Sequence, residues 1–140
     1  NARRSGGSAM KRKGILNSHI SKVLADLGHT DLIAIADAGL PIPDHVQRID
    51  LALTLGVPSY RDVVNAITDD MVVEKVTIAS EMSTQNRDVM QYMQERFTNT
   101  DIQEVSHEEF KHLTNNVKAV IRTGEVTPYA NCILQAGVIF

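Results

Sequence analysis

The fold class is decided by one short stretch, Leu32-Ile33-Ala34-Ile35-Ala36. A continuous apolar run of this kind is typical of a strand that is covered on both faces of its sheet. Helices must then pack against both faces, which is the arrangement of α/β proteins. The stretch therefore predicts a buried strand between two helical layers.

Helical patterns occur on both sides of this strand. One helix face is formed by residues at positions i, i+3, i+4 and i+7, namely Ile20, Val23, Leu24 and Leu27. Gly28 follows, at the position where a left-handed helix cap is expected. Ser59 is a predicted N-cap, a further helix is predicted near Asn86, and Ser106-His107-Glu108-Glu109 fits a capping box. The sequence thus predicts four helices.

Extended patterns occupy much of the remaining chain. Besides the opening stretch, strands are predicted at 48–53, 76–79, 102–105, 119–121 and 132–134. Residues 48–53 alternate polar and apolar side chains, which is typical of a half-exposed strand. Because strands and helices are interleaved, we predict a three-layer α/β/α fold with a central mixed sheet of about six strands.

The composition indicates one domain that needs neither disulfides nor metals for its core. The 140 residues carry 14 basic and 17 acidic side chains, a net charge of −3, and no basic cluster, which argues against a nucleic-acid partner.

Residues 1–9 resemble an expression scar, so we expect a single domain at 10–140 that starts at Met10. No signal peptide follows Met10 and no apolar run reaches membrane-spanning length, so we expect a cytoplasmic protein without a membrane partner. The single cysteine, Cys132, is interpreted as a small buried hydrophobe.

The connection from Arg122 to Asn131 is long and rich in hydrogen-bonding groups. Such loops are more often functional than decorative, and this one suits a neutral polyhydroxylated ligand. Tyr129 and Asn131 are two residues apart and would point the same way in an extended chain. The alternative is that the Tyr129 ring packs under the loop and Asn131 only satisfies a turn.

Two further candidates lie near the first predicted strand. If Gly28 caps the preceding helix, His29 stands at the negative end of the helix dipole, which stabilises imidazolium and suits a proton donor. The alternative is an ordinary surface histidine. Asp37 follows the apolar strand, where open α/β sheets place ligand contacts, although it could merely cap the turn that follows.

His107 and Lys111 are spaced four residues apart on one predicted helix face. The positive end of the helix dipole disfavours imidazolium, so we expect His107 to be a neutral hydrogen-bond partner or base. The alternatives are a solvent-facing histidine and a solvated lysine. The five histidines lack metal-binding spacing, so no metal site is predicted. Neither a phosphate loop nor a nucleophile elbow is present, which argues against nucleotide binding and against Ser-His-Asp catalysis.

Several ordered motifs together resemble the D-ribose pyranase family, which shares a superfamily with the fucose mutarotases. They are Gly14-Ile15-Leu16-Asn17-Ser18-His19, Leu27-Gly28-His29-Thr30-Asp31, Ile35-Ala36-Asp37-Ala38-Gly39-Leu40-Pro41, His107-Glu108-Glu109-Phe110-Lys111 and the run from Ile121 to Asn131. The resemblance covers essentially all of 10–140.

The resemblance implies an enzyme that interconverts the pyranose and furanose forms of D-ribose without a cofactor. It implies His29 as the catalytic acid and sugar contacts from Asp37, His107, Tyr129 and Asn131, with Lys111 nearby. It also implies a ring-shaped homo-oligomer, typically a homodecamer of two stacked pentamers, in which a neighbouring subunit completes each site. The alternative is a non-catalytic sugar-binding or regulatory module of a ribose uptake system.

Overall fold

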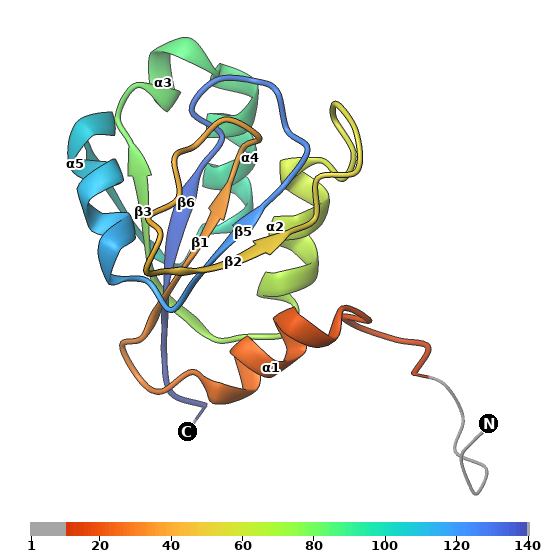
Figure 1. The fold of residues 1–140 in the computed structure, drawn as a ribbon. Helices are drawn as coiled ribbons and strands as arrows, with labels where there is room; N and C mark the ends of the chain where they lie inside the picture. Colours follow the sequence, from red (N-terminus) through yellow and green to blue (C-terminus); the bar gives the residue numbers. More distant parts are fainter. Residues whose placement is uncertain (1–10, 140) are drawn as a thin grey trace, which may run out of the picture.

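A six-stranded sheet lies between two layers of helices in the computed structural model, which describes residues 11–139 (Figure 1). The expected scar at 1–9 and the expected start at Met10 lie outside these residues. Across the sheet the strands follow the order β2 (Gln47–Asp50), β5 (Ala119–Arg122), β1 (Leu32–Ala36), β6 (Cys132–Ala136), β3 (Val73–Ala79) and β4 (Asp101–Val105). Strand β6 runs antiparallel to both neighbours, whereas the other pairs are parallel. The predicted mixed sheet is confirmed.

Helices begin where side chains cap them. The helical elements are α1 (Ser18–Asp26), α2 (Tyr60–Thr68), α3 (Met82–Gln85), α4 (Arg87–Arg96), α5 (His107–Leu113) and the 3-10 turn η1 (Thr114–Asn116). Four of them have an N-cap whose side chain accepts a backbone N–H bond, namely Asn17, Ser59, Asn86 and Ser106. The predicted helix starts are thus confirmed, and the one-turn helix α3 is an addition.

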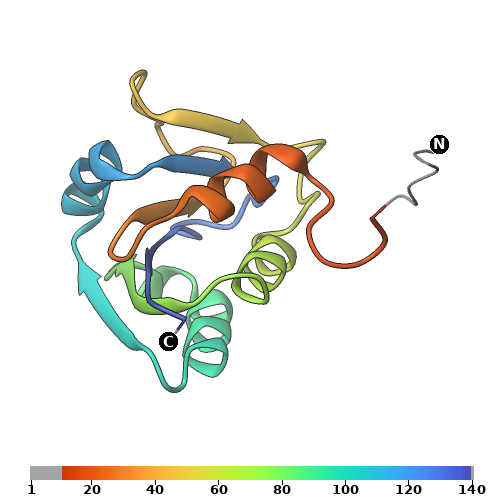
Figure 2. The same cartoon turned by 90° about the horizontal axis from the view of Figure 1, so that it is seen from below.

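The alternation of side chains along β1 divides the core into two layers. Ile33 and Ile35 belong to a large apolar cluster with residues of α1, α2 and α4. Ala34 and Ala36 point to the other face, where Phe110 of α5 is fully buried. Figure 2 shows α5 on one side of the sheet and α2 and α4 on the other. Both faces of β1 are therefore covered, as its apolar sequence predicts.

Two local predictions were wrong. Helix α1 ends at Asp26, and the residue with a left-handed φ of 73° is Thr30 rather than Gly28. The carboxylate of Asp31 closes this turn by accepting from the Gly28 N–H at 2.8 Å, so a left-handed glycine cap is not needed. The strand predicted at 48–53 stops at Asp50, because the chain then folds into a tight loop in which the Leu53 N–H donates to the Val57 carbonyl.

Within residues 11–139 there is no helix of the length and apolar character that crossing a membrane requires. Cys132 is fully buried on β6, which confirms its interpretation as a core residue. Burial raises the pKa of its thiol to about 12.

Candidate functional site

Polar residues gather at the edge of the sheet where the parallel strands end. Asp37 follows β1, Glu81 lies just after β3, and His107 follows β4. Strand β6 runs the opposite way, so Asn131, which precedes it, reaches the same edge. Ligands of open α/β sheets bind at this carboxyl edge, and four of the six predicted site residues, including Tyr129, lie here.

Asp37 and Asn131 are joined by two hydrogen bonds. The Asp37 backbone N–H donates to Oδ1 of Asn131 at 2.8 Å, and Nδ2 of Asn131 lies 3.3 Å from Oδ2 of Asp37. The other carboxylate oxygen accepts from the Gly39 N–H at 3.0 Å. Burial raises the pKa of Asp37, against the opposing effect of these hydrogen bonds. A partly buried carboxyl group of this kind can accept or share a proton.

His107 is the first residue of α5, and its backbone is held by Glu81. The His107 N–H donates to both carboxylate oxygens of Glu81, at 3.0 and 3.2 Å. The imidazole meets the Tyr129 ring edge to face, with centroids 5.0 Å apart and an angle of 80°. Its Nδ1 is buried without a hydrogen-bond partner among residues 11–139. Such a group is costly unless it is paired, and a ligand hydroxyl can bond Nδ1 only if the imidazole turns to expose it.

Most polar groups of the loop 122–131 are used within the fold. Arg122 donates to the Ala38 carbonyl and to both oxygens of Asp50. Glu125 accepts from the Tyr60 N–H at 3.0 Å and from the Thr127 hydroxyl at 2.7 Å. The richness of the loop in hydrogen-bonding groups is therefore largely structural.

Tyr129 and Asn131 do not form the predicted extended pair. Tyr129 has a φ of 58°, and the Asn131 N–H donates back to the Tyr129 carbonyl, so the chain turns between them. Asn131 is 1% exposed and Tyr129 is half-buried. Both still lie beside the other polar groups, because Tyr129 contacts His107 and Asn131 contacts Asp37.

Lys111 lies on α5, one turn after His107, as predicted. Its ammonium group forms an ion pair with Glu108, three residues earlier on the same helix. It would have to leave this carboxylate in order to contact a ligand bound beside Asp37.

His29 lies at the opposite edge of the sheet. It precedes β1 whereas Asp37 follows it, and the four steps between the first and last residues of that strand alone separate them by roughly 13 Å, at about 3.3 Å per step. The His29 ring is half-exposed and its Nε2 lies 2.9 Å from Oε2 of Glu74, at the start of β3. A single chain therefore does not bring His29 to the other predicted site residues. The negative group that contacts it is the Glu74 carboxylate, whereas the dipole of α1 ends at Asp26, three residues earlier.

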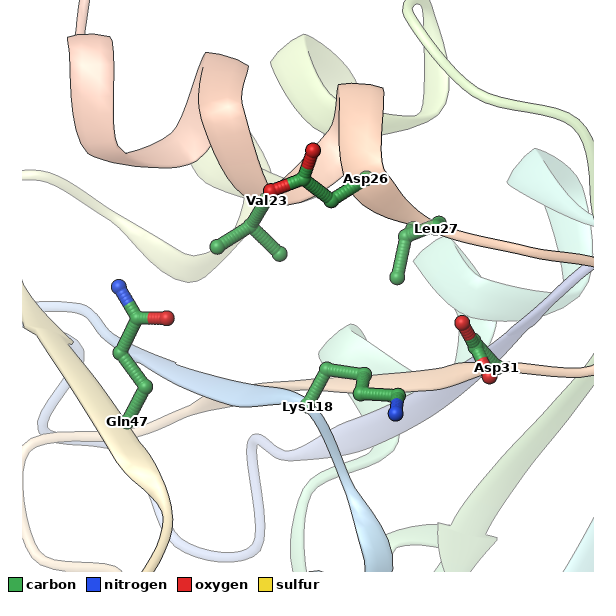
Figure 3. A pocket seen from close by; sticks show the side chains of 6 residues that line it. All are labelled: Val23, Asp26, Leu27, Asp31, Gln47 and Lys118. Atoms are coloured by element: carbon green, nitrogen blue, oxygen red, sulfur yellow. The ribbon is translucent and has the colours of Figure 1, made fainter.

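A cavity of about 260 Å³ lies between α1 and the sheet (Figure 3). Three lining residues come from the end of α1, namely Val23, Asp26 and Leu27. The other three, Asp31, Gln47 and Lys118, come from the strands and turns that face them. None of the predicted site residues lines this cavity, so it is separate from the polar group around Asp37.

A family model described as the RbsD / FucU transport protein family matches residues 10–139. The chain belongs to the RbsD / FucU family. Similar curated members include the D-ribose pyranase of Bacillus velezensis, 63% identical over 131 residues that cover 94% of this chain and 100% of the relative. The D-ribose pyranase of Bacillus subtilis is 56% identical over the same shares of both chains.

Two solved structures that this chain resembles have the same fold. Bacillus subtilis RbsD complexed with D-ribose superimposes with a TM-score of 0.91 at 56% identity, covering 94% of this chain and 100% of that one. A fucose mutarotase from Streptococcus pneumoniae, solved with L-fucose, gives a TM-score of 0.73 at 22% identity over 89% of this chain and 94% of its own. The second similarity concerns the fold alone.

Proposed function

We propose that this protein is a sugar mutarotase that interconverts the β-pyranose and β-furanose forms of D-ribose. The observation that carries the proposal is its 63% identity, over the whole length of the relative, to a D-ribose pyranase. The close superposition on an RbsD solved with D-ribose supports the same substrate. The polar groups around Asp37 also suit a neutral polyol, which needs several hydrogen-bond donors and acceptors at short range.

Ring opening requires two proton transfers and one broken bond, and ring closure forms a new bond with the reverse transfers. As the bond between the anomeric carbon and the ring oxygen breaks, the ring oxygen takes a proton and the anomeric hydroxyl loses one, which leaves an open aldehyde. The aldehyde end rotates, and the hydroxyl that closes a five-membered ring then attacks it with the reverse transfers. Positioned acids and bases accelerate such steps by roughly 10²–10⁴-fold each.

We assign these transfers to the predicted residues. His29 donates the proton to the ring oxygen. Asp37, with its raised pKa, binds a sugar hydroxyl or accepts its proton. Nδ1 of His107 accepts a hydrogen bond from a sugar hydroxyl, while Tyr129 and Asn131 hold the sugar beside it. Lys111 contributes only if the sugar draws it away from Glu108.

For His29 and the group around Asp37 to act on one sugar, a second copy of the chain has to supply one of them, because they lie at opposite edges of the sheet. His29 of one copy would face the group around Asp37 of its neighbour, so that each site has two walls from different subunits. Such an arrangement is heterologous, and repeated contacts of this kind form a ring when the rotation between neighbouring copies closes. We propose a ring-shaped homodecamer in the cytoplasm, and light scattering on the pure protein tests the assembly. A monomer would contradict the shared site.

The activity is tested by saturation-transfer NMR between the ribose anomers. The protein should increase pyranose–furanose exchange, and His29→Ala should remove the increase without unfolding the chain. His19→Ala is a matched control, because His19 is an exposed histidine of α1. Ribose binding without faster exchange would instead indicate a non-catalytic sugar-binding protein.

A further inference from the structure

A short chain of hydrogen bonds holds the side chain of His29. Nε2 of Gln135 donates to Oε1 of Glu74 at 2.7 Å, and Oε2 of Glu74 lies 2.9 Å from Nε2 of His29. The three residues come from β6, β3 and the turn before β1. Because β6 lies between β1 and β3 in the sheet, its Gln135 lies beside the start of both strands and can hold Glu74.

The two bonds engage both oxygens of the Glu74 carboxylate. Gln135 holds one oxygen and the other faces the imidazole, so the orientation of the carboxylate is restrained from both sides. An ionised carboxylate can only accept hydrogen bonds, so the nitrogen that faces it must carry the hydrogen. The hydrogen bond made by one ring nitrogen thus decides the role of the other.

The contact contributes little to stability. The side chains of His29 and Glu74 are 51% and 38% exposed, and exposed ion pairs of this kind are worth little because water screens them. Fixing the orientation and tautomer of a reactive ring requires only a directed hydrogen bond, which this geometry supplies. The pair therefore matches a positioning role better than a structural one.

We propose that Glu74 is a positioning residue for the mutarotase reaction, holding the His29 Nε2–H so that Nδ1 is the nitrogen that faces the sugar. This inference rests on the proposed function. In the ring-opening step, Nδ1–H of the imidazolium gives its proton to the ring oxygen as the bond to the anomeric carbon breaks. The electron pair of the N–H bond stays on Nδ1, and the ring remains the Nε2–H tautomer bonded to Glu74. Glu74 keeps its charge throughout and gains no proton.

Kinetics provide the first test. Glu74→Ala should lower the exchange rate at saturating ribose by roughly 10-fold, a part of what a positioned general acid contributes, with KM unchanged because Glu74 does not touch the sugar. Glu74→Gln should recover part of the rate, since its amide oxygen still accepts from Nε2–H. Glu104→Gln, at an exposed position of β4, is the matched control and should turn over like the wild type. If the wild type is active and Glu74→Ala turns over at the same rate, the positioning role is overturned.

Two NMR measurements test the contact without relying on activity. The hydrogen bonds from His29 and Gln135 lower the pKa of Glu74, with a smaller contribution from the neighbouring Lys75 charge. The carboxyl ¹³C signal of Glu74 should therefore titrate at higher pH in His29→Ala than in the wild type. Long-range ¹H–¹⁵N spectra should show the neutral His29 ring protonated on Nε2. An unmoved Glu74 titration or an Nδ1–H tautomer would overturn the inference, whereas a wild type without exchange but with both NMR signatures would overturn the proposed function.

Discussion

Asp37 and Asn131 are bound to each other across the ends of two neighbouring strands. The backbone N–H of Asp37 donates to Oδ1 of Asn131, and Nδ2 of Asn131 lies within hydrogen-bonding distance of the Asp37 carboxylate. The two residues are 94 positions apart in the chain, and Asn131 is almost fully buried. The amide thus fixes the carboxyl group at the edge where the sugar is proposed to bind.

Replacing Asn131 by alanine should lower the free energy of unfolding by about 1–3 kcal/mol. The substitution leaves the Asp37 N–H without an acceptor and removes a donor from its partly buried carboxyl group. Urea unfolding measures the change. Asn116→Ala is a suitable control, because Asn116 is exposed and its replacement should have little effect. Equal losses for the two variants would contradict the proposed link between Asn131 and Asp37.

The raised pKa of Asp37 predicts how its contribution to stability depends on pH. A carboxyl group with a raised pKa in the folded state contributes its full stability below the unfolded value, near 3.8, and loses it as pH rises through the folded value. The stability of the wild type minus that of Asp37→Asn should therefore fall as pH rises from 3.8 through the raised folded value. Urea unfolding of both proteins across this window measures it. A difference that grows with pH would mean that the fold stabilises the ionised carboxylate.

Gly124 allows the loop 122–131 to approach the loop after β2. A Cβ atom at this position would lie 2.5 Å from the Val57 carbonyl oxygen and 2.6 Å from that of Thr54. Because both obstacles are backbone, Gly124→Ala should destabilise the protein by about 1–3 kcal/mol, as overpacking typically does. Thermal or urea unfolding measures the effect. Gly39→Ala, whose Cβ would meet nothing closer than an Asp37 oxygen at 3.8 Å, should be far milder.

Much of the fold could be predicted because its signals are local. Ser59 and Ser106 cap helices through backbone groups three residues away, and the apolar run at 32–36 reports its burial directly. The failed left-handed cap at Gly28 has a local cause in the neighbouring Asp31, whereas the failed strand prediction depended on a distant partner. The strand expected at 48–53 keeps its alternation beyond Asp50, yet the chain there binds the Arg122 carbonyl and turns away.

The candidate site divides in the same way. Asp37 and His107 could be placed at one edge, because each follows a predicted strand. The residues that hold the two histidines in place could not be predicted. The contact of His107 with Glu81 spans 26 positions, and that of His29 with Glu74 spans 45. Neither hydrophobic periodicity nor a helix-cap pattern in the sequence predicts such long-range contacts. The separation of His29 from Asp37 is different, because it follows from the predicted strand at 32–36 that lies between them.

The shared site is tested most directly by combining two inactive variants. His29→Ala removes one wall and Asp37→Ala removes the other, so each alone should fail to accelerate pyranose–furanose exchange in saturation-transfer NMR. Co-expressed in equal amounts, the two variants should recover about a quarter of the wild-type rate, because both walls are intact at one site in four when neighbouring copies mix at random. If light scattering and mass spectrometry show mixed oligomers but the exchange rate stays at that of ribose in buffer, the two walls do not come from different subunits and the account is wrong.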